Sequence, residues 1–174
     1  AALSGQKGGL HARIFKRKGT VTPANACGIS DGASAVLICT AAKARQMGWT
    51  PLAHYVAHAY AGVEPERMGI APSIAMPRAL KKAGLSLDNM DLVEVNEAFA
   101  GQVLAVGAAM KRQGHNWDWK RFNVNGGAIA LGHPVGSSGS RIVVTMLHEL
   151  KRREAHYGLA SLCAGGGQGS AIIL

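Results

Sequence analysis

The sequence has few cysteines, few aromatic residues and few acidic residues. Its 174 residues include three cysteines, Cys27, Cys39 and Cys163, and Phe, Trp and Tyr make up 5%. Their wide spacing and the lack of a CxxC pair argue against a disulfide framework or a structural zinc site, and predict a reducing compartment. No apolar run has the length of a membrane span, and the start of the chain lacks a signal-peptide core. We therefore expect a soluble, cytoplasmic protein, with the mitochondrial matrix as the other compartment that fits.

Basic residues outnumber acidic ones, 19 against 10, which gives the chain a formal net charge of +9. Five basic residues lie within the first 18 positions, where no acidic residue offsets them. Such a segment fits an anionic partner, either a phosphorylated small molecule or a nucleic acid, but a solvated tail explains it equally well. The few aromatic residues and the lack of a recognisable module argue against nucleic acid. The hydrophobic content of 48% excludes a disordered chain.

Hydrophobic patterns predict strands and helices in alternation along the chain. The expected strands are residues 33–39, 51–60 and 91–95, and the expected helices are residues 41–48, 76–84, 97–114 and 137–154. The last residues, 159–174, are two apolar runs around a glycine-rich turn, which is typical of a β-hairpin. The pattern indicates an α/β layered fold in which helices cover a mixed sheet with a C-terminal β-hairpin. One strand and one helix before residue 51 do not complete a domain, so we expect the chain to be part of something larger.

Particular residues mark the expected ends of these elements. Pro77 is expected in the first turn of its helix, where proline is tolerated. Asn96 lies where a strand passes into a helix and has the side chain of an N-cap, while Ser137 or Ser138 is the expected N-cap of the last helix. The strand at 51–60 is predicted from the β-preference of Leu52, Tyr55 and Val56.

Three polar side chains lie at such junctions: Asn96 after a strand, His133 before a helix and Cys163 at the end of a strand. The crevice at the carboxyl ends of strands is the usual ligand site of α/β sheets. A neutral imidazole can accept a proton from a thiol or donate to an oxyanion, and a nearby helix N-terminus disfavours the imidazolium form. Glycines 165–167 leave backbone N–H groups open, as in a backbone oxyanion site. Each residue also has an ordinary explanation: His133 could contact a loop carbonyl, Asn96 could be an N-cap, and Cys163 could fill the core.

Four segments together resemble the motifs of the thiolases, the acetyl-CoA acetyltransferase family. They are GTVTPANACGISDGASAV at 19–36, NEAFA at 96–100, NVNGGAIALGHPVGSSGSR at 123–141 and CAGGGQG at 163–169. The motifs follow one another in family order, and the resemblance runs from about residue 15 to the C-terminus. It implies the thiolase-like layered fold. Residues 1–12 match no family segment.

The resemblance implies a chemical role for four residues. His133 would deprotonate the nucleophilic cysteine and donate to the oxyanion hole for the thioester oxygen, where Asn96 would position a water molecule. Cys163 would be the acid/base that moves a proton on and off the acetyl α-carbon. Gly165 would offer its backbone N–H to a second oxyanion hole. These residue types suit carbon–carbon bond formation between thioesters, which needs an acyl carrier, a base and stabilised oxyanions.

Four further positions match the pantetheine channel of the family: Ala26, Cys27, Ala98 and Phe99. Coenzyme A and acyl-CoA are therefore the expected substrates, with no tightly bound cofactor and no metal. The chain departs from the family pattern here, because thiolases generally have serine in place of Cys27 and Ala-Gly in place of residues 23–24. A thiol is a weaker hydrogen-bond partner than a hydroxyl, so the change bears on pantetheine affinity.

The resemblance covers the carboxy-terminal half of a thiolase. It assigns residues 1–28 to the end of a coenzyme A-binding loop region, residues 29–51 to a strand and helix of the amino-terminal core half, and residues 52–174 to the carboxy-terminal core domain. The nucleophilic cysteine of the family lies in the amino-terminal half. The family alignment places Cys27 in the channel and Cys39 inside a strand, so we expect neither to replace it.

The implied function is that of an acyltransferase for reversible thiolytic cleavage and Claisen condensation of acyl-CoA thioesters. A missing half or partner chain would supply the nucleophilic cysteine within a homo- or hetero-oligomer, and the chain alone would be inactive. A ketoacyl synthase is disfavoured, because those enzymes pair the cysteine with two histidines. A catalytically inactive scaffold subunit is the alternative, and a nucleic-acid-binding protein is supported by charge only. Acyl-chain preference and direction stay open.

Overall fold

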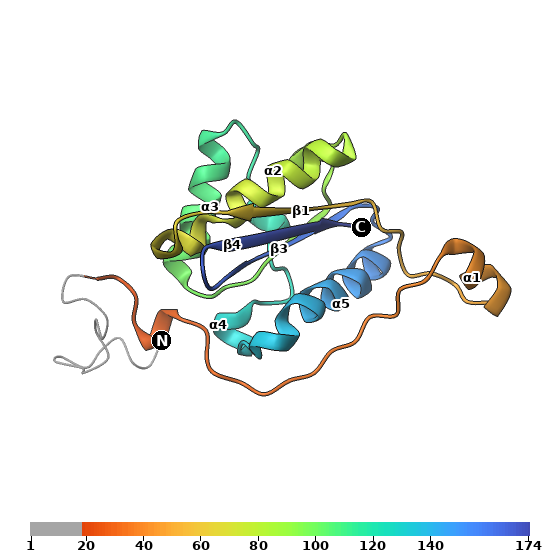
Figure 1. Cartoon of the computed structure of the whole chain (residues 1–174), viewed down its shortest axis with the longest axis horizontal. Helices are drawn as coiled ribbons and strands as arrows, with labels where there is room; N and C mark the ends of the chain where they lie inside the picture. The colour runs from red at the N-terminus through yellow and green to blue at the C-terminus, as the bar shows by residue number, and fades with distance from the viewer. Residues whose placement is uncertain (1–18) are drawn as a thin grey trace.

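The structure is a computed structural model that describes residues 19–174 (Figure 1). The basic start of the chain and most of the predicted segment 1–28 lie outside the described residues. The α-helices are α1 (Ala41–Met47), α2 (Pro72–Ala83), α3 (Ala100–Arg112), α4 (Ala128–Leu131) and α5 (Val135–Arg153). The strands are β1 (Ala57–Gly62), β2 (Leu92–Val95), β3 (Gly158–Ala164) and β4 (Gln168–Ile173). Short 3-10 turns occupy Pro23–Asn25, Pro65–Ile70, Leu87–Asn89 and Trp119–Arg121.

The strands form one mixed sheet in the order β1-β4-β3-β2. β3 and β4 are the predicted hairpin, β1 pairs antiparallel with β4, and β2 runs parallel to β3. Helices α2 and α3 lie on one face of this sheet and α4 and α5 on the other (Figure 1). The expected α/β fold with a helix-covered mixed sheet is therefore confirmed, and the parallel pair brings the carboxyl ends of β2 and β3 to the same edge.

Each face of the sheet has its own apolar core. Alternate residues of β2 point to opposite faces, as the two-residue period of a strand requires. Val93 and Val95 join the larger cluster with Met76, Leu80 and other residues of α2 and α3. Leu92 joins a smaller cluster against α5, around Met146 and its neighbours. Residues Glu94 and Asn96 share the strand face of Leu92, so β2 presents polar groups toward α5.

The expected strand at 33–39 is absent, and Cys39 therefore lies in no strand. The segment is an exposed connection that runs beside α5 (Figure 1), with Leu37 75% and Ile38 84% exposed. A strand needs a neighbour for its backbone N–H and C=O groups. Within residues 19–174 none of the four strands pairs with this segment.

Strand β1 begins six residues later than the expected strand at 51–60. β1 begins at Ala57, and the side chains that suggested it, Leu52, Tyr55 and Val56, precede it and are exposed. The residues of β1 that face the core are alanines. Pairing with β4 and close packing against α2 decide the position of the strand, rather than its intrinsic propensity.

Helix α2 begins at Pro72, so Pro77 lies inside the helix and not in its first turn. An interior proline has no N–H for the carbonyl four residues earlier, here that of Ser73. The side-chain Nε2 of Gln113, at the end of α3, donates to the Ser73 carbonyl oxygen at 3.2 Å. A contact between two helices therefore satisfies the acceptor that Pro77 leaves open. The helix ends as predicted at Gly84, which has a left-handed φ of 68°.

The expected N-cap of the last helix is wrong, and Asn96 does not have the N-cap role that was its ordinary explanation. α3 begins at Ala100 with Phe99 as its N-cap, so Asn96 ends the sheet ladder and caps no helix. α5 begins at Val135, which places Ser137 and Ser138 inside its first turn. Because Asn96 and Ser138 cap no helix, their side chains are available for the candidate site. None of the helices in the described residues is long and apolar enough to cross a membrane.

Candidate functional site

Two of the sequence-predicted residues, Asn96 and Cys163, lie at the edge where β2 and β3 both end. Asn96 follows β2 directly, and its backbone N–H donates to the Ser161 carbonyl of β3 at 3.0 Å. Cys163 is the next-to-last residue of β3. Parallel pairing of Val95 with Ser161 therefore fixes both residues at one end of the sheet. Among the described residues, the side chains of Asn96, His133 and Cys163 make no hydrogen bond with one another.

The side chain of Asn96 is buried without a protein partner. Asn96 is 2% exposed, and neither its Oδ1 nor its Nδ2 has a hydrogen-bond partner within the described chain. Leaving a buried amide unpaired costs about 1–3 kcal/mol, so native proteins rarely do so without a reason. An amide that keeps a donor and an acceptor open can hold a water molecule or a substrate atom.

Asn123 holds the strand that carries Asn96. Its Oδ1 accepts from the Val95 N–H at 2.8 Å, and its Nδ2 donates to the Val95 carbonyl and to Glu97 Oε1, both at 2.9 Å. The side chain thus takes the place of a neighbouring strand at the edge of β2. Glu97 also accepts from the N–H of Ile129 in α4. A Cβ on Gly127 would overlap the Glu97 carboxylate, so glycine is required there.

His133 lies in the short turn between α4 and α5. Its Nδ1 is 2.6 Å from Ser138 Oγ, and this hydroxyl also reaches the Pro134 carbonyl at 3.2 Å. Burial lowers the pKa of His133, and the positive charge of Arg141 lowers it further. The imidazole is therefore kept neutral at physiological pH, as a general base requires. The sequence suggested the helix N-terminus as the cause, whereas burial is the larger one.

Residues 26–29 form a strap that connects the two loops of the site. The Cys27 N–H donates to the Ala98 carbonyl at 3.0 Å, next to a backbone bridge between Ala26 and Phe99. One residue later, the Gly28 carbonyl accepts from the His133 N–H at 3.0 Å. The four positions assigned to the pantetheine channel thus lie together, and the strap continues from them to the imidazole loop.

Cys163 is buried, with 7% of its surface exposed. Burial raises the pKa of its thiol, and the neighbouring Cys27 raises it further. The proximity of these two sulfurs places the cysteine end of β3 beside the strap. A thiol with a raised pKa holds its proton at neutral pH, so it is not a resting nucleophile, and it can donate that proton to a stronger base such as a carbanion.

The glycine turn after Cys163 joins β3 to β4. Gly166 and Gly167 have left-handed φ values of 83° and 86°, and a Cβ on Gly167 would collide with the Val63 carbonyl. These two positions therefore require glycine. Gly165 has open space around it and is exposed, so its lack of a side chain is not dictated by packing. Its N–H remains free of side-chain cover, as the prediction for this residue needs.

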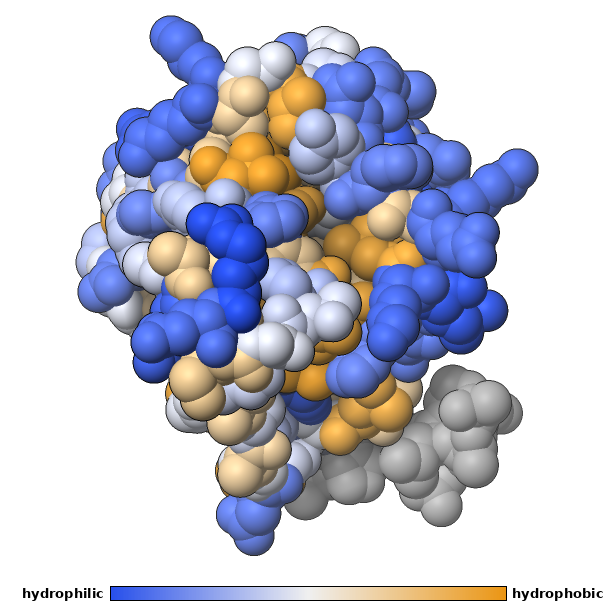
Figure 2. All heavy atoms as spheres, turned by 90° about the vertical axis from the view of Figure 1, so that its right-hand side faces the viewer, coloured by the Kyte–Doolittle hydropathy of each residue, from blue (hydrophilic) through white to orange (hydrophobic). Residues whose placement is uncertain are grey.

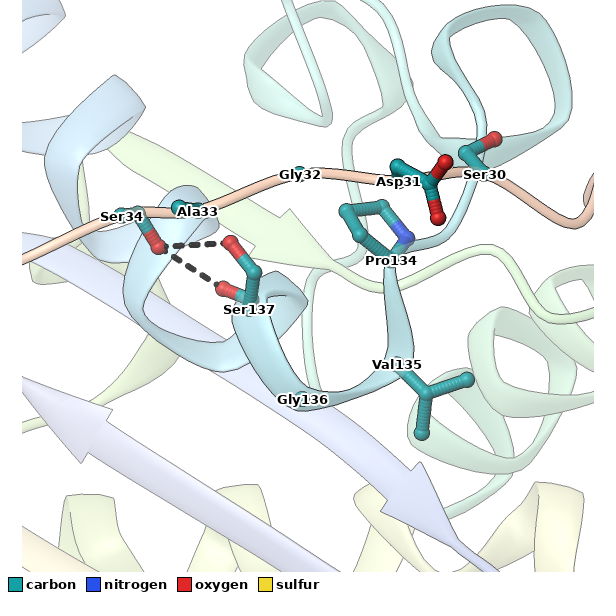
Figure 3. A pocket seen from close by; sticks show the side chains of 9 residues that line it. All are labelled: Ser30, Asp31, Gly32, Ala33, Ser34, Pro134, Val135, Gly136 and Ser137. Carbon is teal, nitrogen blue, oxygen red and sulfur yellow. Dashed lines mark hydrogen bonds between the residues drawn. The ribbon is translucent and has the colours of Figure 1, made fainter.

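An open groove of about 440 Å³ lies between residues 30–34 and the start of α5 (Figure 3). In Figure 3, the side chain of Ser34 points toward that of Ser137, and the two hydroxyl oxygens are 2.8 Å apart. A Cβ on Gly32 would collide with the ring of Pro134. These contacts hold the otherwise exposed segment against the helix that follows His133. No cluster of His, Cys, Asp or Glu suited to a metal ion occurs in the described residues.

Comparison with known proteins identifies the family to which these α/β layers belong. The family description "Thiolase, C-terminal domain" matches residues 49–174, and "Thiolase, N-terminal domain" matches residues 9–42. The chain belongs to the thiolase family. The second match begins at residue 9, so the expectation that residues 1–12 match no family segment is wrong for residues 9–12.

Individual relatives agree with this family. The chain is 55% identical over 160 residues to the acetyl-CoA acetyltransferase of Cupriavidus necator, and 53% identical over 161 residues to the human mitochondrial 3-ketoacyl-CoA thiolase. The crystal structure of the human enzyme in complex with CoA superposes with a TM-score of 0.86, and that of the Bacillus anthracis acetyl-CoA acetyltransferase with 0.85 at 45% identity. These matches cover 91–92% of this chain and 39% of each relative.

Several residues that shape the site gave no recognisable signal in the sequence. Asn123, Glu97 and Arg141 lie within or beside the family motifs, but their partners are residues nine or more positions away. Ser138 was expected to cap a helix, and its contact with His133 depends on how the first turn of α5 faces the imidazole. Of these contacts, sequence spacing could have suggested only that between His133 and Ser138, which lie five residues apart at the start of a helix.

Proposed function

We propose that this chain forms the acid/base half of a thiolase that catalyses reversible thiolytic cleavage of 3-ketoacyl-CoA. The observation that carries the proposal is that Asn96, with its buried amide unpaired, and Cys163 lie where β2 and β3 both end, while the backbone of residues 27 and 28 bonds to Ala98 and His133. The lowered pKa of His133 and the raised pKa of Cys163 support it. Membership of the thiolase family and relatives named acetyl-CoA acetyltransferase and 3-ketoacyl-CoA thiolase support it.

In the condensation direction, His133 accepts the proton of a nucleophilic cysteine that lies outside these 174 residues. That thiolate attacks the acyl-CoA carbonyl carbon, and coenzyme A leaves as its thiol after taking the proton of the Cys163 thiol. Cys163, now a thiolate, removes a proton from the α-carbon of acetyl-CoA. The resulting carbanion attacks the acyl-enzyme, and the released cysteine takes its proton back from His133. Thiolysis is the same sequence reversed. His133, a water molecule on Asn96, and the Gly165 N–H stabilise the oxyanions formed on the way.

Coenzyme A is proposed to enter as substrate along the strap. Ala26 and Cys27 on one side and Ala98 and Phe99 on the other offer short or flat side chains around backbone groups already held together. Because Cys27 stands where thiolases generally have serine, its weaker thiol hydrogen bond is the feature that bears on pantetheine affinity. We propose no tightly bound cofactor.

A partner segment with the nucleophilic cysteine is part of the proposal. Leu37 and Ile38 in the connection to α1, and Leu52 and Tyr55 before β1, expose apolar side chains that a folded domain normally covers. Hydrophobic areas lie between hydrophilic residues on the face viewed in Figure 2. We propose that a second thiolase half covers these side chains. Such units would then form an oligomer. The proposed compartment is the cytoplasm or the mitochondrial matrix.

The proposed function is tested by reconstituting the chain with an amino-terminal thiolase half. The chain is co-expressed with the amino-terminal thiolase domain of a relative, and the purified complex is assayed for thiolysis of acetoacetyl-CoA. We expect activity in the complex and none in the chain alone. The His133→Ala variant should lose about 10²–10⁴-fold in rate, as removal of a general base does. His148→Ala, on the exposed face of α5, is the matched control and should keep its activity.

A folded complex without activity would favour the inactive scaffold subunit instead. Cys163→Ser separates the two half-reactions: acyl-enzyme formation should persist while condensation fails. Loss of both steps together would contradict the proposed role of this thiol. Native mass spectrometry of the protein from its own source would show directly whether it travels with a second chain that has a reactive cysteine or within a longer polypeptide.

A further inference from the structure

A small buried cavity lies beneath Asn96, on the side of the sheet that faces α5. Its polar side-chain lining comes from Glu94, Asn96, Asn123, Arg141 and Thr145, with the backbone of Gly126 and Gly127 beside them. Its volume is about 10 Å³, close to the roughly 10–15 Å³ that a single water molecule requires. Several polar groups around such a volume meet the other requirement for a buried water, which is two to four hydrogen-bond partners.

Glu94 is the least expected residue of this lining. It is 2% exposed, and its Oε1 has no hydrogen-bond partner within the described chain. It lies two positions before Asn96 on β2, so both side chains point to the same face of the strand. Two unpaired, buried polar side chains therefore meet one small cavity. A buried carboxyl group without a partner is costly, and a shared water molecule would satisfy both residues at once.

Arg141 connects the same cavity to the imidazole loop. Its guanidinium NH1 donates to the Gly132 carbonyl at 2.8 Å, directly before His133. In the described residues no Glu94–Arg141 contact is short enough to be an ion pair, since the three ion pairs found there involve other residues. The guanidinium therefore donates to a backbone carbonyl and lines the cavity, and in the described residues it forms no ion pair with a carboxylate.

We propose that Glu94 and Arg141 are positioning residues of the site: Glu94, as a neutral carboxyl group, shares one buried water molecule with the Asn96 amide, and Arg141 fixes the Gly132–His133 backbone. The two residues set the orientation of the amide and of the imidazole without touching substrate. Their catalytic consequence rests on the proposed function, whereas the buried water and the neutral carboxyl are properties of the folded chain alone.

The charges around Glu94 favour its protonated form. Its pKa is raised to about 8 in all: burial is the largest cause, Glu97 after β2 and Glu149 on α5 also raise it, and Arg141 lowers it. A protonated carboxyl has a donor for a water molecule as well as an acceptor, which an ionised one lacks. The raised pKa stabilises the fold fully below the ordinary value of 4.5, and this contribution is lost as pH rises toward 8.

The test uses NMR of the 174-residue chain. The Asn96 side-chain amide, assigned with an Asn96→Asp variant, should show a cross-peak to long-lived water and a chemical shift that changes with a midpoint near pH 8. Glu94→Gln should keep the water cross-peak and lose the pH dependence. Glu94→Leu should lose both. A wild-type amide without the cross-peak, or without a midpoint between pH 6 and 9, overturns the proposal without any variant.

The role of Arg141 is tested by measuring the pKa of His133. Removing the guanidinium charge in Arg141→Met should raise the pKa of the His133 imidazole measured by NMR, and Arg141→Lys, which keeps the charge, should leave it near the wild-type value. Equal pKa values in all three proteins would exclude an electrostatic effect of Arg141 on His133.

The catalytic effect of Glu94 is tested separately, by measuring kcat and KM of Glu94 variants in the reconstituted complex. Glu94→Leu should lower kcat by about 10–100-fold, the size expected for a misplaced catalytic group, with KM changed less than about threefold. Glu94→Gln should restore most of the loss. If Glu94→Leu and Glu94→Gln have the same kcat, the residue does not position Asn96. If the complex is inactive throughout while the NMR results hold, the proposed function fails and the water site stands.

Discussion

His133 Nδ1 lies 2.6 Å from the hydroxyl oxygen of Ser138, a residue with no exposed surface. A hydroxyl can donate to this nitrogen, or accept from it while donating to the Pro134 carbonyl 3.2 Å away. Nε2 can therefore carry the lone pair of a base or the N–H of an oxyanion donor, without any movement of the ring. A general base that also stabilises an oxyanion needs such a partner.

Replacing Ser138 should impair the imidazole more than the fold. In Ser138→Ala, the Nδ1 of the half-buried imidazole loses its hydrogen-bond partner, so kcat of the reconstituted complex should fall about 10-fold. Ser140→Ala on the next turn is the control, because its hydroxyl bonds only to neighbouring serines. Equal rates in both variants would show that His133 does not depend on Ser138.

Replacing Asn123 should destabilise the end of β2. Asn123→Ala removes three hydrogen bonds to Val95 and Glu97 and places alanine at a φ of 42°. The free energy of unfolding should fall by about 2–4 kcal/mol, measured by chemical denaturation. Asn123→Gly keeps the backbone conformation and loses the same bonds, so it should be the less destabilised variant. A loss below about 0.5 kcal/mol in both would contradict the role given to this side chain.

Two strand glycines should differ in their tolerance of alanine. A Cβ on Gly169 in β4 would lie 2.7 Å from the Ala71 carbonyl carbon and Cβ at the start of α2, whereas Gly62 in β1 has nothing within 4 Å. Gly169→Ala should lower the free energy of unfolding by about 1–3 kcal/mol through overpacking. Gly62→Ala should change it by less than about 0.5 kcal/mol. Thermal melts of the two variants check this ranking, and the reverse order would refute the packing described.

The cysteines should react with iodoacetamide at very different rates. Cys39 is exposed, while Cys163 is buried and has a raised thiol pKa. At pH 7.5 the label should reach Cys39 first. Labelling of Cys163 should rise only as the pH increases past 9, the ordinary value, because only the thiolate reacts. Peptide mass spectrometry gives both rates, and early labelling of Cys163 at neutral pH would mean that its thiol is ionised.

Much of the site could be predicted from the sequence because its residues belong to contiguous motifs. Asn96, His133 and Cys163 each follow or precede a strand or helix whose pattern is local, and parallel strands end at a common edge. Hydrogen-bond partners could not be predicted in the same way. Asn123 reaches back 28 residues to Val95, and nothing in the local pattern of either residue specifies the other.

The sequence by itself determined the family, the helix-ending glycines at 48 and 84, strand β2 and the C-terminal hairpin, because turn chemistry and hydrophobic period are local properties. Tertiary structure alone decided that residues 33–39 form no strand in the described chain and that Pro77 lies within a helix. A strand exists only where another backbone pairs with it, and that proline is tolerated because Gln113 satisfies the Ser73 carbonyl. Both outcomes depend on which surfaces meet after folding.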